Sequence, residues 1–464
     1  MITKNEIDFN KFRGNLFYKD GKNQKNWEDV HLIVKKLTNY FNECGLKQGD
    51  IIAIDTNKDF YTYCTILSCY IYGITFAPLR FSEIDEKLSV CSNININCFL
   101  SSTNKDLEEF VLISDLVEHQ NKSNHVIQLE MELNSIAYIL HSSGSTGNPK
   151  VIPITYNNLH NYIQSVIDMS DIKSQSTFAQ TVELTFDLSI HDMFLCFYKG
   201  GSLVPLSTSI ARFAPRFIDS LRINNLMLVP SFITAMNASN ITMNSVKNVF
   251  FCGEALGAKI AKKALELFPN AKIYNFYGPT EATVAVSYFE VTSNNIGENN
   301  IVPIGKPLSS SVLMLSDEHE LLIGGKQVFN GYLGRTDRNS LLFIGDKKFY
   351  KSGDICSYDG ENFKFVSRID FQIKFRGYRI ELEGIEVILG NKFNGSFGAI
   401  GFNETSTNSF TELMIFYSDK NLLISDMKNS LPKHLNGVTF KYVNSIPRNN
   451  SDKVDRYQLK RLIT

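Results

Sequence analysis

The chain has 464 residues, which is enough for a large buried core and at least two domains. Hydrophobic residues make up 43% of the chain and charged residues 20%, an ordinary balance for a soluble globular protein. The 47 basic and 48 acidic side chains leave a formal net charge of -1, so no global field attracts nucleic acid or an anionic membrane.

The first hundred residues alternate helix and strand signals. Residues 1–13 are polar and charged and lack the apolar centre of a signal peptide. Residues 27–44 carry apolar side chains at helical spacing, and Gly45 can end that helix. The apolar run at residues 51–54 then predicts a buried strand. This rhythm is typical of an α/β domain with a largely parallel sheet.

Residues 60–79 contain no charged side chain and are long enough to span a bilayer. They include several Tyr and Thr residues together with Gly73 and Pro78, so the stretch is only moderately apolar. We expect a buried helix that ends near Gly73, then a core strand, and no membrane insertion. The eight cysteines form no CxxC pair and no zinc spacing, which favours reduced thiols in a cytoplasmic protein.

The second half of the chain changes character twice. Residues 310–366 are rich in strand signals and Gly turns, which predicts antiparallel β structure. Mixed α/β patterns resume after Asp370 for roughly ninety residues, enough for a small domain. We therefore predict an α/β protein of two domains. Residues 1–369 form a large domain of mixed sheets and helices with a β-rich subdomain, and residues 370–464 form a small, mobile α+β domain.

A glycine-rich loop follows the strand predicted at residues 136–140. It reads HSSGSTGNPK and ends in Lys150, whose ammonium suits a β- or γ-phosphate. Its glycines and hydroxyl side chains let many backbone N–H groups approach a phosphate. A Walker loop would open a helix here, but Pro149 and Pro153 argue against one. An ATP hydrolase or switch of the Walker type is therefore disfavoured.

The segment SSGSTGNPK resembles the phosphate loop of the adenylate-forming superfamily, which contains acyl-CoA synthetases, amino-acid adenylation domains and luciferases. Further blocks follow in the family's order over residues 27–459: FDLSIHD, NFYGPTE, YKSGD, SRIDFQIKFRGYRIE and PRNNSDKVDR. A single glycine loop is a weak signal, whereas this order is specific. The resemblance implies activation of a carboxylic acid by ATP and Mg²⁺ to an acyl-adenylate.

The resemblance also assigns the nucleotide contacts. It implies that Tyr277 stacks on adenine, that Thr280 meets the α-phosphate and that Glu281 holds Mg²⁺, roles that suit an aromatic face, a hydroxyl and a carboxylate. Asp354 and Arg368 would bind the ribose. The other nucleotide-binding residues that it implies are Ser143, Gly144, Ser145, Thr146, Gly147, Gly253, Glu254, Asn275 and Phe276.

Two blocks near the C-terminus concern the small domain. By resemblance, Asp370 is the hinge on which this domain turns, and Lys453 bridges the substrate carboxylate and the α-phosphate, where it stabilises developing charge together with Lys150 and Thr280. The family usually has glycine where this chain has Val151, Ser367 and Asp452. A carboxylate beside Lys453 could compete for its ammonium.

Asp187 indicates the class of acid. In amino-acid activators, the aspartate of the FDLS block pairs with the substrate α-ammonium, and a helix N-cap is the alternative reading for this residue. A buried carboxylate left unpaired costs about 3–5 kcal/mol, so acids without an amine are rejected. The resemblance puts around the side chain of the substrate Leu188, His191, Met227, Phe250, Cys252, Phe276, Val284 and Ala285.

Three of these residues are bulky rings, so we expect a small amino acid such as alanine, glycine or serine. The stretches FDLS, FCGEAL and YGPTEATVAV are similar to D-alanine–carrier protein ligases, in which a cysteine at the position of Cys252 bears on chirality. His191 and Phe276 depart from that group. A standalone activator of an L-amino acid for a peptide natural product therefore stays open.

The implied second step passes the acyl group to a thiol. The chain ends soon after Leu459, so we expect a separate phosphopantetheinylated carrier protein rather than coenzyme A as acceptor. No Cys/His pair suggests a covalent enzyme intermediate. The alternatives are a CoA ligase for an acid without an amine, which Asp187 opposes, and a non-catalytic nucleotide-binding protein, which Asp452 favours.

Overall fold

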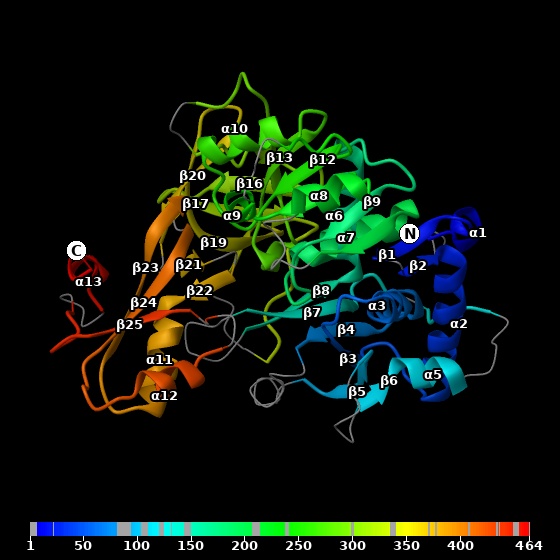
Figure 1. The fold of residues 1–464 in the computed structure, drawn as a ribbon, viewed down its shortest axis with the longest axis horizontal. Coiled ribbons are helices and arrows are strands. Elements are labelled where there is room, and N and C mark those ends of the chain that lie inside the picture. The colour runs from blue at the N-terminus through cyan, green and yellow to red at the C-terminus, as the bar shows by residue number, and fades with distance from the viewer. Residues whose placement is uncertain are drawn as a thin grey trace.

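The computed structural model gives the chain a large N-terminal part and a smaller C-terminal part that stand side by side (Figure 1). It describes residues 7–21, 23–80, 94–103, 110–119, 125–130, 132–142, 150–206, 214–236, 241–297, 301–334, 340–369, 372–375, 378–406, 409–432, 435, 437–448 and 454–463.

A six-stranded sheet lies near the beginning of the chain. Its strand order is β6-β5-β3-β4-β7-β8, and every neighbouring pair except β7 and β8 is parallel. Its strands are β3 (Ile51–Asp55), β4 (Thr75–Leu79), β5 (Ile96–Ser101), β6 (Phe110–Leu112), β7 (Ile136–Ser142) and β8 (Lys150–Thr155). The helices α2 (Trp27–Glu43), α3 (Phe60–Tyr72) and α5 (Ile113–His119) lie beside it.

A nine-stranded sheet forms the second layer, in the order β15-β14-β13-β12-β11-β9-β10-β1-β2. Its strands are β1 (Leu16–Asp20), β2 (Asn23–Asn26), β9 (Thr177–Gln180), β10 (Ser202–Pro205), β11 (Asn225–Leu228), β12 (Asn248–Phe251), β13 (Lys272–Tyr277), β14 (Ser287–Val291) and β15 (Lys306–Pro307). The run from β1 through β10, β9, β11 and β12 to β13 is parallel. This arrangement directs the carboxyl ends of six consecutive strands to one edge.

The remaining helices of the large part fill the connections between these strands. They are α1 (Phe9–Phe12), α6 (Tyr156–Met169), α7 (Leu188–Lys199), α8 (Ala214–Ser220), α9 (Pro230–Ala235) and α10 (Ala258–Leu267), with a 3₁₀ turn, η4, at Thr280–Ala282. Helix α7 is buried around its whole circumference, and the side chains from Leu188 to Tyr198 are all buried. A helix of this kind belongs between layers of a core rather than on the surface.

A third, antiparallel sheet follows in the chain. It consists of β16 (Ser311–Leu315), β17 (Glu320–Gly325), β18 (Leu341–Ile344), β19 (Lys347–Tyr358) and β20 (Phe363–Arg368). The antiparallel β structure expected for residues 310–366 is therefore confirmed.

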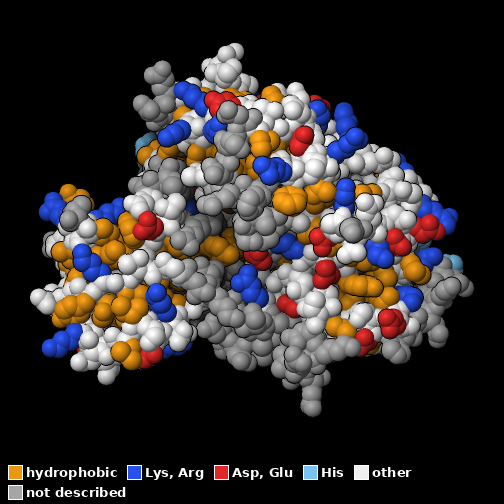
Figure 2. All heavy atoms as spheres, viewed as in Figure 1, with side chains coloured by type: hydrophobic (Ala, Val, Ile, Leu, Met, Phe, Trp, Pro, Cys, Tyr) orange, Lys and Arg blue, Asp and Glu red, His pale blue; other side chains and the backbone are white. Residues whose placement is uncertain are grey.

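The C-terminal part has its own sheet and its own core. Its elements are β21 (Gln372–Phe375), β22 (Tyr378–Glu381), α11 (Leu382–Lys392), β23 (Phe397–Ser406), β24 (Ser409–Tyr417), α12 (Ile424–Asn429), β25 (Thr439–Tyr442) and α13 (Arg456–Arg461). In Figure 1 this part is orange and red, and in Figure 2 hydrophobic and basic side chains mingle over its face. The α/β fold class with a large and a small domain is confirmed.

Local sequence accounts for the elements predicted near the N-terminus. Helix α2 begins at Trp27 and stops at Glu43, and Gly45 follows with φ at 67°. Helix α3 ends at Tyr72, and Gly73 terminates it in the left-handed conformation at φ 104°. Within the described residues, no helix has the length and hydrophobicity needed to cross a bilayer. Seven cysteines in the same residues are free thiols.

Asn26 and Trp27 connect α2 to the nine-stranded sheet. The Asn26 side chain accepts from the backbone N–H of Asp29, and the Asp29 carboxylate accepts from that of Asn26, which makes a capping box. The fully buried Trp27 ring donates from Nε1 to the carbonyl oxygen of Gly201 at 2.9 Å. The start of α2 is thus stabilised by the capping box and by the hydrogen bond from Trp27.

We expect Asn26→Ala to lower the free energy of unfolding of the large domain by about 1 kcal/mol, because the backbone N–H of Asp29 at the helix start loses its partner. Trp27 is the single tryptophan of the chain, so its fluorescence during urea unfolding reports this region. Asn23→Ala, an exposed residue of β2, is the control. Equal unfolding midpoints for the two variants would contradict the importance of the cap.

Candidate active site

The candidate site lies where the parallel strands of the nine-stranded sheet end. Asp187 follows β9, Cys252 follows β12, and Thr280 follows β13. The carboxyl ends of parallel strands meet at one sheet edge, where open α/β sheets bind their ligands. The fold therefore brings together the motifs that lie far apart in the sequence.

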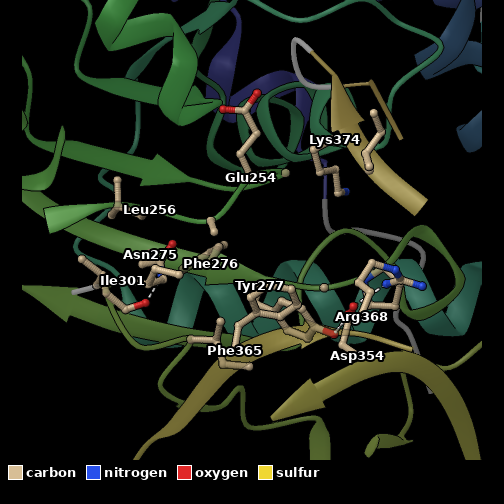
Figure 3. Close-up of a pocket in the computed structure, with 17 residues that line it drawn as sticks. Glu254, Leu256, Asn275, Phe276, Tyr277, Ile301, Asp354, Phe365, Arg368 and Lys374 are labelled. Atoms are coloured by element: carbon tan, nitrogen blue, oxygen red, sulfur yellow. Dashed lines mark hydrogen bonds and ion pairs between the residues drawn. The ribbon is translucent and has the colours of Figure 1, made fainter. Parts of the chain in front are cut away.

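A cavity opens to solvent at this edge (Figure 3). Its apolar walls come from β13 and from the loop after β12, and its polar groups come from β19 and β20. Two further residues, Ile373 and Lys374, reach it from β21 of the small domain. The other lining residues are Gly253, Glu254, Ala255, Leu256, Asn275, Phe276, Tyr277, Gly278, Pro279, Ile301, Val302, Ile304, Asp354, Phe365 and Arg368.

Three polar side chains converge at one end of this cavity. The Tyr277 hydroxyl donates to Oδ2 of Asp354, and Nη1 of Arg368 donates to Oδ1 of the same carboxylate (Figure 3). Burial, and then the nearby Asp354 charge, raise the pKa of the Tyr277 phenol, so it stays a protonated donor. A carboxylate held between two donors is prepared to accept the hydroxyl groups of a sugar.

Asp187 and Thr280 meet beside the cavity. The Thr280 hydroxyl donates to Oδ2 of Asp187 at 2.6 Å. Asp187 stands at the N-cap position of α7 but caps no backbone N–H there, so the N-cap reading is wrong. Burial raises the pKa of its carboxyl group, and the Thr280 hydrogen bond and the Lys374 ammonium oppose that rise. An ammonium bound here would favour the charged carboxylate.

Next to Asp187 the structure packs a set of fully or almost fully buried side chains. The His191 ring lies 4.7 Å from the Phe250 ring and 6.0 Å from the Phe276 ring, measured between centroids. The Cys252 thiol approaches the Val284 carbonyl oxygen at 3.9 Å. All eight predicted pocket residues are at most 3% exposed: Leu188, His191, Met227, Phe250, Cys252, Phe276, Val284 and Ala285. These rings and the packed thiol leave little room for a substrate side chain.

Burial also fixes the chemistry of two of these groups. It raises the pKa of the Cys252 thiol to about 12, which excludes a thiolate nucleophile at neutral pH. It lowers the pKa of His191 to about 3, so the imidazole is neutral. Nδ1 of His191 is 2.7 Å from the Tyr162 hydroxyl, while Nε2 has no hydrogen-bond partner in the described part of the chain. The pocket is therefore lined by neutral groups.

A second set of polar residues lies around Glu281, which is fully buried. Its Oε1 accepts from the Tyr332 hydroxyl at 2.7 Å. The Lys150 ammonium lies 5.8 Å from the centre of the Tyr332 ring. Tyr332 thus connects the predicted metal carboxylate to the predicted phosphate lysine.

The hairpin formed by β21 and β22 covers this end of the site. Oε1 of Glu381 pairs with the Lys150 ammonium at 2.9 Å, with side-chain exposures of 3% and 16% respectively. The Tyr378 ring stands edge-on to Phe186, 4.6 Å away between centroids. The Lys374 ammonium is near enough to lower the pKa of Asp187. The small domain therefore contacts both Asp187, the predicted ammonium partner, and Lys150, the predicted phosphate lysine.

Comparison with known proteins identifies the family. Residues 7–333 match the family of AMP-binding enzymes. The chain belongs to this family.

The relatives of this AMP-binding enzyme are similar along most of its length. The D-alanine–D-alanyl carrier protein ligase of Bacillus licheniformis is 30% identical over 357 residues, which cover 70% of this chain and 71% of that protein. The ligase of the same name from Staphylococcus epidermidis is 27% identical over 418 residues, 84% of this chain and 85% of that protein. The predicted superfamily and the AMP-forming ligase class are confirmed.

Solved structures agree with the fold. The Vibrio cholerae adenylation domain AlmE, crystallised with glycyl-adenosine-5'-phosphate, has a TM-score of 0.84 at 21% identity, over 100% of this chain and 98% of that chain. Holo-PA1221, an NRPS protein with adenylation and PCP domains, has a TM-score of 0.84 at 19% identity, over 98% of this chain and 83% of that chain. At these identities the likeness establishes the fold alone.

Several of the predicted site residues lie outside the described residues: Ser143, Gly144, Ser145, Thr146, Gly147, Asp370 and Lys453, as does Asp452. Of the others, seven line the cavity: Gly253, Glu254, Asn275, Phe276, Tyr277, Asp354 and Arg368. Lys150 begins a strand, β8, and not a helix, as the two prolines predicted. Glu254 lines the cavity and also binds Ser231 through both its oxygens.

Sequence reasoning missed four polar residues that hold the site together. Tyr162 bonds His191, Tyr332 bonds Glu281, Glu381 bonds Lys150, and Gln327 binds the turn after η4. Tyr162 sits on the buried face of an amphipathic helix, where an aromatic residue predicts core packing. Glu381 did stand within a recognised block, but nothing in its spacing indicates a lysine 231 positions away.

The low pKa of His191 predicts a loss of stability in acid. The unfolded chain binds a proton at a pKa near 6.5 but the folded chain only near 3, so stability falls as the pH drops below about 6.5. At pH 5 this difference is about 2 kcal/mol. We expect His191→Asn to remove that part of the pH dependence, measured by urea unfolding at pH 7.5 and pH 5.

The same substitution at the exposed His319 is the control for this experiment. His319→Asn should unfold with the pH dependence of the wild-type chain. If His191→Asn also follows the wild-type curve, His191 is not held neutral in the folded protein.

Proposed function

We propose that this chain activates glycine or alanine with ATP and transfers the aminoacyl group to the phosphopantetheine thiol of a separate carrier protein. The hydrogen bond between Thr280 and Asp187 carries this proposal. It makes the expected ammonium subsite and the expected α-phosphate subsite direct neighbours. An α-amino acid has its amine and its carboxylate on one carbon, so it is short enough to bridge them.

The small side chain follows from the packing beside Asp187. His191, Phe250 and Phe276 are in mutual ring contact, and each is at most 2% exposed. A pocket bounded by three rings favours hydrogen or methyl as the substrate side chain, because an added methylene requires displaced atoms. The names of the relatives, D-alanine ligases and a glycyl-adenylate complex, agree with that size.

The first step joins the acid to the nucleotide. A carboxylate oxygen of the amino acid attacks the α-phosphorus of ATP, the bond to the bridging oxygen breaks, and pyrophosphate leaves. Asp354 and Arg368 are suited to hold the ribose, while Lys150 and Lys453 are proposed to stabilise the developing charge. Glu281 has the donor chemistry for Mg²⁺, which takes one or two protein carboxylates and completes its shell with phosphates. Bound there, Mg²⁺ would neutralise phosphate charge.

The second step exchanges the adenylate for a thiol. The carrier thiol attacks the acyl carbon, gives up its proton, and AMP leaves with the former carboxylate oxygen. We place the hinge for this step at Asp370 and the boundary of the small domain beside it. The names of the relatives include a carrier protein, which supports such an acceptor. Since ATP is a substrate, we propose a cytoplasmic setting.

The first experiment measures pyrophosphate release with Mg·ATP while hydroxylamine traps the adenylate. The panel contains glycine, both alanine enantiomers, larger amino acids and acids without an amine. We expect activity with glycine or one alanine, and a decrease in kcat/KM of about a hundredfold to a thousandfold in Asp187→Asn, which leaves the ammonium unpaired.

Thr181→Ser serves as the control, because it keeps the hydroxyl that bonds Met227 at the same sheet edge. Activity only with acids that lack an amine would exclude the role of Asp187 and indicate a CoA ligase. Bound ATP without any release would indicate a non-catalytic protein.

The hairpin predicts a link between ATP and the small domain. Glu381 supplies the Lys150 ammonium with a carboxylate, the charge that an ATP phosphate would otherwise provide. We expect the two anions to compete for this ammonium, so that ATP binding weakens its pair with Glu381. After pyrophosphate leaves, Glu381 can pair with Lys150 again and stabilise the hairpin over the site during thiol transfer.

We therefore expect Glu381→Gln to have opposite effects on the two steps. The dissociation constant for Mg·ATP should fall about fivefold, because no ion pair has to be broken, and transfer to the carrier should slow by a similar factor. Glu412→Gln, whose carboxylate bonds Asn403 within the small domain, is the control. Loss of ATP affinity, or unchanged transfer, would contradict the competition.

A further inference from the structure

The backbone directly after η4 is held in an unfavourable conformation. Thr283 and Val284 have φ of 62° and 67° in the left-handed region, which glycine adopts readily and β-branched residues do not. Two such residues in succession persist only where the surroundings hold them. The turn lies within the site, because Glu281 precedes these residues and Ala285 follows them.

Gln327 supplies the restraint. Its fully buried side-chain amide donates from Nε2 toward the carbonyl oxygens of Ala282 at 3.3 Å, Thr283 at 3.3 Å and Ala285 at 2.6 Å. The hydroxyl of Thr283 donates back to the Gln327 carbonyl oxygen at 2.8 Å. One side chain thus binds the turn on both sides of its strained residues.

The amide is itself fixed by two serines. Oε1 of Gln327 accepts from Ser310 Oγ at 2.5 Å and from Ser311 Oγ at 3.0 Å. With the oxygen occupied by these donors, the NH₂ group must face the turn. The orientation of the amide is therefore set by β16 and the residue before it, outside the pocket.

The turn contributes Val284 and Ala285 to the predicted side-chain pocket. The Val284 carbonyl oxygen is 3.9 Å from the Cys252 thiol, and the main chain of the turn packs against Gly278. A Cβ at Gly278 would lie 2.5 Å from Cα of Ala285 and 2.8 Å from the Val284 oxygen. The wall is thus confined by Cys252 and Gly278 on one side and by Gln327 on the other.

We infer that Gln327 is a positioning residue that sets the size of the substrate side chain by holding the wall at residues 283–285. It acts through the turn, whose residues Val284 and Ala285 border the pocket. This inference rests on the proposed function, since it concerns the acid that the same site activates. The class of substrate it selects is an α-amino acid with hydrogen or methyl as its side chain.

The test substitutes Gln327 by Met, which keeps the length of the side chain but cannot hydrogen-bond. Adenylate formation is measured with glycine, alanine, 2-aminobutyrate and valine, and also with acetate, propionate and butyrate. We expect the ratio of kcat/KM for 2-aminobutyrate over glycine to rise about tenfold, because the released wall can draw back by one methylene.

Gln327→Glu separates the two faces of the side chain. It keeps the oxygen for Ser310 and Ser311 but removes the donors to the carbonyl groups of the turn. It should therefore raise the ratio of kcat/KM for 2-aminobutyrate over glycine, as Gln327→Met does. Asn158→Ala is the structural control. Its buried amide donates to the carbonyl oxygens of Lys326 and Val328, on either side of Gln327, but makes no hydrogen bond to the turn within the described part of the chain.

The inference would be overturned if the ratio of kcat/KM for 2-aminobutyrate over glycine in both Gln327 variants stayed within about twofold of wild type, or fell below it. An equal rise in Asn158→Ala would also overturn it, because that would make the effect one of general loosening. If the wild-type chain activates only acids without an amine, the proposed function fails, but the ratio of butyrate over acetate still tests Gln327.

Discussion

The hydrogen bond between Thr280 and Asp187 is the contact on which the site depends. It joins the start of α7 to the turn after β13, two segments 93 residues apart in the chain. Because β9, β11, β12 and β13 are consecutive parallel neighbours, the sheet delivers both segments to the same edge. The closeness of Thr280 and Asp187 is thus a consequence of strand order.

Two buried polar groups near this contact have hydrogen-bond partners from other elements. Tyr162 of α6 holds His191 of α7, and Tyr332 holds Glu281. A buried polar group without a partner is costly, so each pair favours one arrangement of two elements over the alternatives. The pairs therefore fix the position of walls and ligands while the apolar rings exclude water.

The fold and the location of the site could be predicted largely from the sequence. Strand-loop motifs such as NFYGPTE are recognisable from local sequence alone. The prolines near Lys150 correctly predicted that no helix begins there. The supporting contacts could not be predicted. Gln327 looks like one polar residue in a strand-rich region, and its importance arises only when the turn at residues 282–285 is brought against it. Long-range pairing of this kind leaves no periodic trace in the chain.

The two sides of the site differ in how they are held, and the difference fits the chemistry. The wall beside Cys252 is bound by neutral hydrogen bonds to a fully buried glutamine, which no substrate charge can displace. The side facing the small domain is bound by charges, Glu381 on Lys150 and Lys374 near Asp187. The ammonium group of an amino acid is positive, as Lys374 is, and the phosphates of a nucleotide are negative, as Glu381 is. A selective wall has to stay in place throughout the reaction, whereas a covering hairpin has to leave and return. Neutral contacts suit the first requirement and exchangeable ion pairs suit the second.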